Sequence, residues 1–350
     1  MPNRRQTTAF LAATVASGLP GCSSPPASSA TAATRPMPLA LTPLSVISFG
    51  GGFNLPLWAA RQQRLFEAHG LQATPHVTPD SKQLFSGLMD GRYQVAITAF
   101  DNIVAYQEGQ GEIAFSPPSD FFAFMGSDDG FLSLVAAPEI KTFADLRGKT
   151  ISVDAMTNGF SFALREMLAR NGLAESDVQW ARAGGTDKRF AALMQREHAA
   201  TMLRAPFDLQ ARNRGFNTLA TVREVVGPYM GIVGAARRSF AQQQPQAITG
   251  FIRAYRDALH WLRQPANRNA AEALLIANVP NMSADLARQS FELMLHPVSG
   301  FFANAQLDAA GVRSVMAMRS RLGQPPKNLT DPTRYIDERY WAEAQRPNTR

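Results

Sequence analysis

Short apolar runs alternate with segments of helical spacing along this chain, and the alternation begins twice. Such a pattern predicts parallel sheets with helices on their faces, in which a ligand crevice lies at the carboxyl ends of the strands. Glycines at the ends of the helical segments support the division. The first block comprises strands at 44–49, 71–77 and 93–98, and helices at 55–69 and from Asp80 or Ser81 onward.

The second block follows two extended segments and repeats the order of the first. It comprises strands at 150–153, 178–181 and 200–203, and helices at 161–171, 188–196 and 206–213. Extended segments at 121–136 and 229–235 flank this block, so we expect the chain to cross between two lobes there. We predict an α/β fold with lobe 1 formed by 41–130 and 236–345, lobe 2 formed by 131–235, and a central cleft. Helices expected at 245–263, 266–278, 283–295 and 308–322 would wrap lobe 1.

The first 22 residues have the features of an export signal. Arg4 and Arg5 precede an apolar stretch over 9–16, and small residues lead to Cys22. Leu19-Pro20-Gly21-Cys22 resembles a bacterial lipobox, which predicts lipidation of Cys22 and a location in the periplasm or at the cell-envelope surface. Ordinary secretion is the alternative, because Pro20 departs from the usual pattern. Residues 23–40 are rich in Ser, Pro and Ala, and we expect a disordered tether.

Composition argues against several other classes of protein. The net charge is +7, but no run of five basic residues offers a nucleic-acid footprint. A single cysteine excludes an internal disulfide framework. The five histidines lie in separate elements without metal-ligand spacing, and neither a G-x-S-x-G elbow nor a Walker loop occurs. We therefore expect no metal, no cofactor and no enzymatic activity.

Four motifs, in order, carry a resemblance to a known family. The run 145–153, Asp-Leu-Arg-Gly-Lys-Thr-Ile-Ser-Val, is similar to "DLKGKxIxV", and 88–96 is similar to "L-x-x-G-x-x-D-V-A/G" with Gln94 at the aspartate. The run 64–71 is similar to "GLFxxxGL", with Arg64 at the first glycine. Arg204-Ala205-Pro206-Phe207 lies where many members have "W-E-P-F". The chain thus resembles the sulfonate-, nitrate- and thiamine-precursor-type substrate-binding proteins of ABC importers.

The resemblance implies a periplasmic-binding-protein-like fold of type II, with two hinge crossovers. It also implies a monomer that closes over a small molecule and delivers it to an ABC permease and its ATPase. The sequence favours an anionic or heteroaromatic ligand. A ligand receptor for a sensor system, or an enzyme on the same fold, is the alternative.

Candidate ligand-binding residues lie in the strand-to-helix loops that line the cleft of such a fold. They are Gly51, Gly52, Phe53, Asn54, Ser81, Thr98, Phe100, Asp101, Thr157, Asn158, Gly159, Ser161, Arg204 and Phe207.

Each group of candidates also has a structural explanation. The glycines can serve a turn, and Asp101 and the 157–159 loop can cap helices. The phenylalanines can belong to the core. A buried Arg204 needs either a carboxylate such as Asp208 or an anionic ligand.

Overall fold

The computed structural model describes residues 40–347. The predicted signal peptide with Cys22, and the tether up to residue 39, lie outside the described residues.

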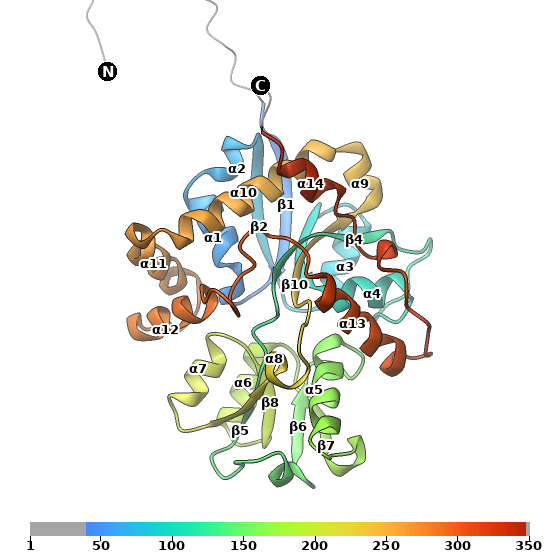
Figure 1. Cartoon of the computed structure of the whole chain (residues 1–350), viewed down its shortest axis with the longest axis vertical. Helices are drawn as coiled ribbons and strands as arrows, with labels where there is room; N and C mark the ends of the chain where they lie inside the picture. Colours follow the sequence, from blue (N-terminus) through green and yellow to red (C-terminus); the bar gives the residue numbers. More distant parts are fainter. Residues whose placement is uncertain (1–39, 348–350) are drawn as a thin grey trace, which may run out of the picture. The chain divides into compact units, whose positions relative to one another are not determined.

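The first sheet has five strands, in the order β2-β1-β3-β10-β4 (Figure 1). Strand β1 pairs in parallel with β2 and β3, whereas β10 lies antiparallel between β3 and β4. The β10 strand comes from much later in the chain than its neighbours. The bounds are β1 Thr42–Phe49, β2 Leu71–Thr78, β3 Val95–Ala99, β4 Phe121–Asp128 and β10 Ile232–Arg237.

The second sheet repeats this arrangement in the order β7-β6-β8-β5-β9. Strand β6 pairs in parallel with β7 and β8, and β5 runs antiparallel to β8 and β9. The bounds are β5 Ser133–Ala136, β6 Thr150–Val153, β7 Gln179–Arg182, β8 Ala200–Leu203 and β9 Asn217–Thr221.

Two crossover segments connect the sheets and touch each other. One runs from the end of β4 to β5, and the other returns through α8 (Val222–Val225) to β10. At their contact, a Cβ added to Gly231 would lie 2.0 Å from the backbone nitrogen of Gly130, so only glycine allows this approach. Two α/β sheets joined by two crossovers confirm the predicted fold.

The helices agree with the expected ones except at a few places. The single helix expected at 55–69 is divided at Arg64, whose φ of 55° is left-handed at the position where the family motif has glycine. Helix α4 begins directly after β3, at Phe100, so Asp101 lies in its first turn and does not cap it as expected. Helices α8, α9 and α14 and strand β9 were not expected. The bounds are α1 Leu55–Gln62, α2 Leu65–Ala68, α3 Ser81–Met89, α4 Phe100–Gln107, α5 Gly159–Arg170, α6 Thr186–Met194, α7 Phe207–Arg212, α9 Arg238–Gln243, α10 Pro245–Arg263, α11 Arg268–Asn278, α12 Ala284–Met294, α13 Ala309–Leu322 and α14 Arg339–Ala344.

The C-terminal helices contact both halves of the fold. Helix α10 packs against α1, α2 and α14, which belong with the first sheet. Helix α13 lies between α4 and α5 (Figure 1), and α12 contacts α7. One hydrophobic cluster therefore includes Phe85 beside the first sheet, Val315 of α13 and Leu164 of α5. The residue boundaries of the two lobes stay a prediction.

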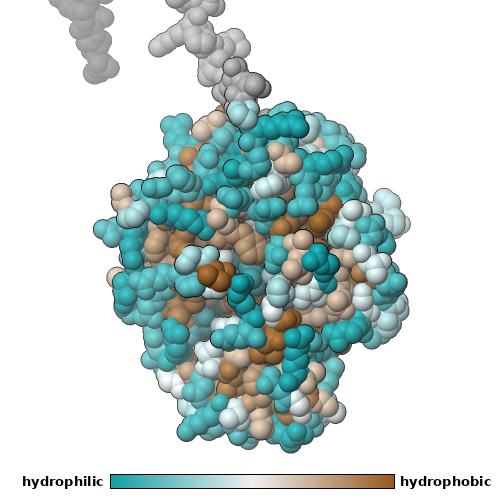
Figure 2. Space-filling model, viewed as in Figure 1, coloured by the Kyte–Doolittle hydropathy of each residue, from teal (hydrophilic) through white to brown (hydrophobic). Residues whose placement is uncertain are grey.

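No helix in residues 40–347 is both long and apolar enough to cross a bilayer. On the face shown in Figure 2, hydrophilic residues cover most of the surface and apolar residues form scattered groups.

Candidate functional site

A cleft opens where the carboxyl ends of strands from both sheets meet. It has an outer chamber of about 200 Å³ and an inner chamber of about 70 Å³. The outer chamber includes residues that follow β2 and β6, and the inner chamber includes Arg204, which follows β8. Five residues line both chambers, which makes the two spaces continuous: Phe49, Asn102, Asp154, Asn158 and Gly185.

Arg204 is a buried cation of the inner chamber whose hydrogen-bonding capacity is not used. Only 5% of the residue is exposed, and its guanidinium lies 4.1 Å from the centre of the Phe53 ring. The nearest carboxylate is that of Asp128, at 3.9 Å from Nη2, which is too far for a hydrogen bond. The Nε and Nη2 atoms have no hydrogen-bond partner within the described residues. A buried donor without a partner is costly, so these atoms suit an acceptor from a ligand.

The expected alternative partner, Asp208, is engaged elsewhere. Its Oδ1 accepts a hydrogen bond from the Leu209 N–H at 2.8 Å, and its Oδ2 accepts one from Ser133 Oγ at 3.3 Å. Asp208 therefore does not satisfy the guanidinium of Arg204.

Arg189 adds a second buried positive charge to the inner chamber. Its Nε donates to the Gly184 carbonyl at 3.1 Å, Nη1 donates to the Met202 carbonyl, and Nη2 donates to Thr186 Oγ1 at 3.1 Å. Within residues 40–347, no carboxylate forms an ion pair with it. The hydrogen-bond donors of Arg189 are therefore satisfied, but its positive charge has no carboxylate in an ion pair with it.

Two helices begin at the inner chamber. Gly159 and Phe160 at the start of α5 line it, and so do Gly185 and Thr186 at the start of α6. The first N–H groups of a helix have no intrahelical partner, and they carry the positive end of the helix dipole. Together with Arg204 and Arg189, these helix ends make the inner chamber suited to an anion.

The carboxylates near Arg204 resist ionisation. Burial raises the pKa of Asp128 to about 6, although the charge of Arg204 acts in the opposite direction. Burial also raises the pKa values of Asp129 and Asp208. The positive charge of the inner chamber is therefore least compensated under mildly acidic conditions.

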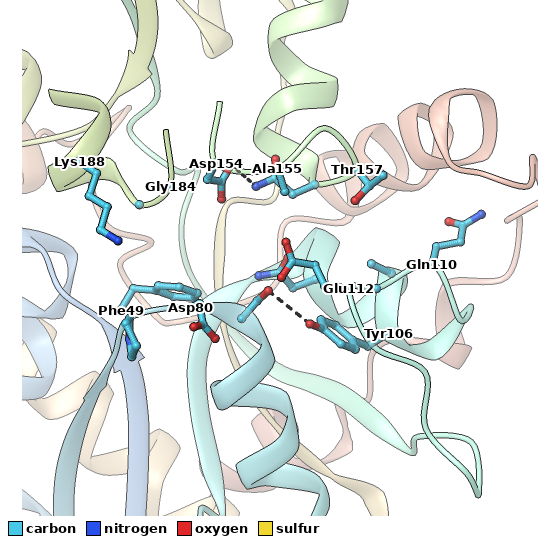
Figure 3. A pocket seen from close by; sticks show the side chains of 17 residues that line it. Phe49, Asp80, Tyr106, Gln110, Glu112, Asp154, Ala155, Thr157, Gly184 and Lys188 are labelled. Carbon is cyan, nitrogen blue, oxygen red and sulfur yellow. Dashed lines mark hydrogen bonds between the residues drawn. The ribbon is translucent and has the colours of Figure 1, made fainter. Parts of the chain in front are cut away.

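The outer chamber has the opposite character. Asp80, Glu112 and Asp154 line it, with Lys188 as the cation (Figure 3). Asp154 is half-buried and accepts a hydrogen bond from Asn158 Nδ2, whereas Asp80 and Glu112 are exposed. In Figure 3, Glu112 and Asp154 lie on opposite sides of the chamber.

Of the residues expected to bind ligand, the structure places six in the lining of the cleft. Those six are Phe53, Ser81, Thr157, Asn158, Gly159 and Arg204. The other eight lie outside that lining: Gly51, Gly52, Asn54, Thr98, Phe100, Asp101, Ser161 and Phe207.

Most of these eight have structural contacts. Asn54 Nδ2 donates to the Phe49 carbonyl at 2.7 Å, and Thr98 Oγ1 accepts a hydrogen bond from Asn102 at 3.2 Å. The Ser161 N–H donates to Asn158 Oδ1 at 2.9 Å, which caps α5. Phe100 is buried in the core, and Phe207 packs against Phe190. Whether any of the fourteen contacts a ligand stays a prediction.

Asp101 has a buried partner that sequence reasoning did not find. Only 1% of the residue is exposed, and Arg319 of α13 donates Nε to its Oδ1 at 2.7 Å and Nη2 to its Oδ2. The same Nη2 donates to the Thr157 carbonyl at 2.7 Å. Arg319 therefore links α4 to the loop that lines the cleft before α5.

Several lining residues were not among the candidates expected from the sequence, including Phe49, Glu112, Asp154 and Arg189. Asp154 directly follows the strand predicted at 150–153, so its position at a strand end could have identified it. Within residues 40–347, no group of three or more His, Cys, Asp and Glu side chains could hold a metal ion.

Comparison with known proteins gives a family match and a fold match. Residues 54–267, more than half of the chain, match the family described as NMT1/THI5 like. No curated protein sequence matches the chain.

Three solved structures illustrate the fold match. The periplasmic nitrate-binding protein NrtA from Synechocystis PCC 6803 has a TM-score of 0.70 and 13% identity, covering 87% of this chain and 88% of that chain. The periplasmic aliphatic sulphonate binding protein SsuA from Escherichia coli has a TM-score of 0.65 and 18% identity, covering 86% and 99%. The desulfurization enzyme DSZB has a TM-score of 0.58 and 14% identity, covering 86% and 98%.

Proposed function

The chain belongs to the NMT1/THI5-like family, and from that premise we propose that it is the solute-binding component of an ABC importer that captures a small organic anion. The main observation in favour of an anionic ligand is Arg204, a buried guanidinium with two unpartnered nitrogens at the inner chamber. The beginnings of α5 and α6 support the same ligand chemistry. Similarity to a nitrate-binding and a sulphonate-binding protein supports a role in uptake.

Delivery to a permease is also consistent with a cleft that is lined by residues from both sheets. A ligand held by residues from both sheets shifts the protein toward its closed form, which a transporter can recognise. In this proposal the protein works in the periplasm or at the cell-envelope surface, anchored by a lipid on Cys22.

An enzyme on this fold is the second candidate, because the neighbour DSZB is named a desulfurization enzyme. The enzyme alternative is tested by recovering the bound ligand and checking whether it has been converted. We expect a bound compound to be released chemically unchanged after long incubation with the protein, and a converted product would favour the enzyme.

The proposal is tested by ligand screening followed by uptake. The purified protein would be screened by thermal unfolding against small sulfonates, carboxylates, nitrate and uncharged heteroaromatic compounds. A ligand at 100 times its Kd should add about 2.7 kcal/mol to the free energy of unfolding. We expect hits among the anions, and cells without the gene should lose high-affinity uptake of the same compound. Hits confined to uncharged compounds would contradict the anion assignment, and unchanged uptake would contradict the importer role.

Anion affinity is expected to fall as the pH rises from about 5 to about 7.5. Asp128 has a raised pKa of about 6, and an anion beside Arg204 would raise this pKa further, so binding takes up a proton. The raised pKa values of Asp129 and Asp208 act in the same direction. Calorimetry with a sulfonate, which does not titrate in this range, would isolate the contribution of the protein.

The matched variant for this prediction is Asp128→Asn, which preserves shape and removes the titrating group. It should flatten the pH profile, whereas Asp90→Asn at an exposed position should leave the profile unchanged. A wild-type affinity that does not vary with pH would contradict the mechanism.

A further inference from the structure

The two chambers of the cleft have opposite charge. The inner chamber carries Arg189 and Arg204, both buried, whereas the outer chamber carries Asp80 and Glu112, both exposed. Lys188 offsets only part of the negative charge of the outer chamber. The cleft therefore carries negative charge in the outer chamber and positive charge in the adjoining inner chamber.

Asp154 lies where the two chambers join. It lines both of them, and one of its carboxylate oxygens, Oδ1, accepts a hydrogen bond from Asn158 Nδ2. A group held at the junction would meet this half-buried carboxylate on one side. In Figure 3, Glu112 lies across the outer chamber from Asp154, and it comes from the loop after α4. A cationic or strongly hydrogen-donating group fits between two carboxylates, and a second anionic group does not.

The acidic residues of the outer chamber alone would not identify a ligand, because exposed carboxylates are usually solvated. The independent observation is Arg204, which is 5% exposed and has unpartnered Nε and Nη2 atoms at the adjoining inner chamber. An anion bound there fixes one end of a ligand in the inner chamber. The other end must then extend past Asp154 toward the outer chamber.

Resting on the proposed function, we infer that the ligand is dipolar, with an acid group held at Arg204 and an amine or other cationic group held at Asp154 and Glu112. The walls between these ends include Phe49 and Phe53, which suit a short apolar spacer. A simple alkyl anion would satisfy Arg204 but would bring no cationic group to Asp154 and Glu112. Discrimination between the two ligand types then arises in the outer chamber.

Calorimetry with matched pairs of compounds tests this inference. The probes are ω-aminoalkyl sulfonates with two to five carbons, the alkyl sulfonates of equal length, and the corresponding aminocarboxylates and carboxylates. We expect the best amino compound to bind at least about tenfold tighter than its partner without the amine. One spacer length should be preferred, because Arg204 and Asp154 follow paired strands of the same sheet, β8 and β6.

Variants assign that preference to the residues of the outer chamber. Glu112→Gln and Asp154→Asn should each reduce the ratio between the paired affinities toward one. Glu197→Gln, which removes the same charge at an exposed position outside the cleft lining, is the matched control and should keep the full ratio.

The possible outcomes separate this inference from the proposed function. Equal affinity for both members of every pair would overturn the dipolar ligand and leave the anion-binding function standing. Tighter binding of the plain anions would also overturn it. No binding of any sulfonate or carboxylate would overturn the anion assignment itself, and the dipolar ligand with it.

Discussion

Replacement of Arg319 by methionine is expected to lower the free energy of unfolding by about 3–5 kcal/mol, because it leaves the buried carboxylate of Asp101 without a counter-ion. Both carboxylate oxygens of Asp101 accept hydrogen bonds from Arg319, and the two side chains are 1% and 0% exposed. The guanidinium also donates to Gln110 Oε1 at 3.1 Å and lies 4.7 Å from the centre of the Phe162 ring. Denaturant unfolding measures the change directly.

The chain offers a matched control on the same helix. Arg321 donates to Glu166 at 2.7 Å, but its side chain is 59% exposed. Such surface pairs contribute about 0–1 kcal/mol, so Arg321→Met should change stability little. Similar losses in the two variants would contradict a special role for the buried pair.

A double variant separates the loss of a contact from the exposure of a buried charge. Asp101→Asn combined with Arg319→Met removes both charges, so it should be more stable than Arg319→Met alone. A double variant less stable than the single one would show that the uncompensated carboxylate is not the cause of the loss.

Arg319 also holds a loop that lines the cleft, in addition to stabilising the fold. Its hydrogen bond to the Thr157 carbonyl holds the loop that presents Thr157 and Asn158 to the outer chamber. Because the other end of the same guanidinium is fixed on α4, this loop is held against the first sheet and its helices. In Arg319→Met, ligand affinity should therefore fall even under conditions where the variant stays folded.

Local sequence patterns predicted the elements that have clear boundaries. The bounds expected for β6, β8 and α10 match the observed Thr150–Val153, Ala200–Leu203 and Pro245–Arg263. Gly148 precedes the first of these elements, and Pro245 begins the last of them. The start of α4 was not located because Val95–Gln107 is a continuous run without glycine or proline, in which the strand passes directly into the helix.

The candidate site was predictable only where its residues follow a strand. Arg204 and Asn158 lie in loops after predicted strands, so topology placed them at the cleft. Arg189 lies inside a helix, where a basic residue ordinarily indicates a solvated face, and Glu112 lies in a loop without a periodic pattern. The partner of Asp101 is 218 residues away in the sequence, a distance over which a single sequence gives no pairing signal.

The contrast between two buried arginines provides the sharpest test of the binding site. Every nitrogen of Arg319 has a hydrogen-bond partner, whereas two nitrogens of Arg204 have none. Groups that serve folding are satisfied in the folded protein, and a group kept for a ligand is left incomplete. The two residues should therefore respond differently to the same substitution.

Arg204→Met is expected to weaken binding of the anion identified by screening by about a hundredfold or more. Two hydrogen bonds from a charged donor contribute about 1.5 kcal/mol each, and each 1.4 kcal/mol is a factor of ten in affinity. The free energy of unfolding without ligand should change by less than about 1 kcal/mol. Methionine can keep the contact with Phe53, and it removes donors that had no partner.

Asp128 does not become an uncompensated charge in this variant. It keeps hydrogen bonds from the Gly130 N–H at 2.7 Å and from Ser127 Oγ at 3.1 Å. Without Arg204 the pKa of Asp128 rises further, which favours the uncharged carboxyl over a buried charge. Calorimetry and denaturant unfolding on one preparation would give both quantities, with Arg212→Met at an exposed position as the control for net charge. Retained affinity, or a loss of stability as large as that of Arg319→Met, would show that Arg204 serves the fold and not the ligand.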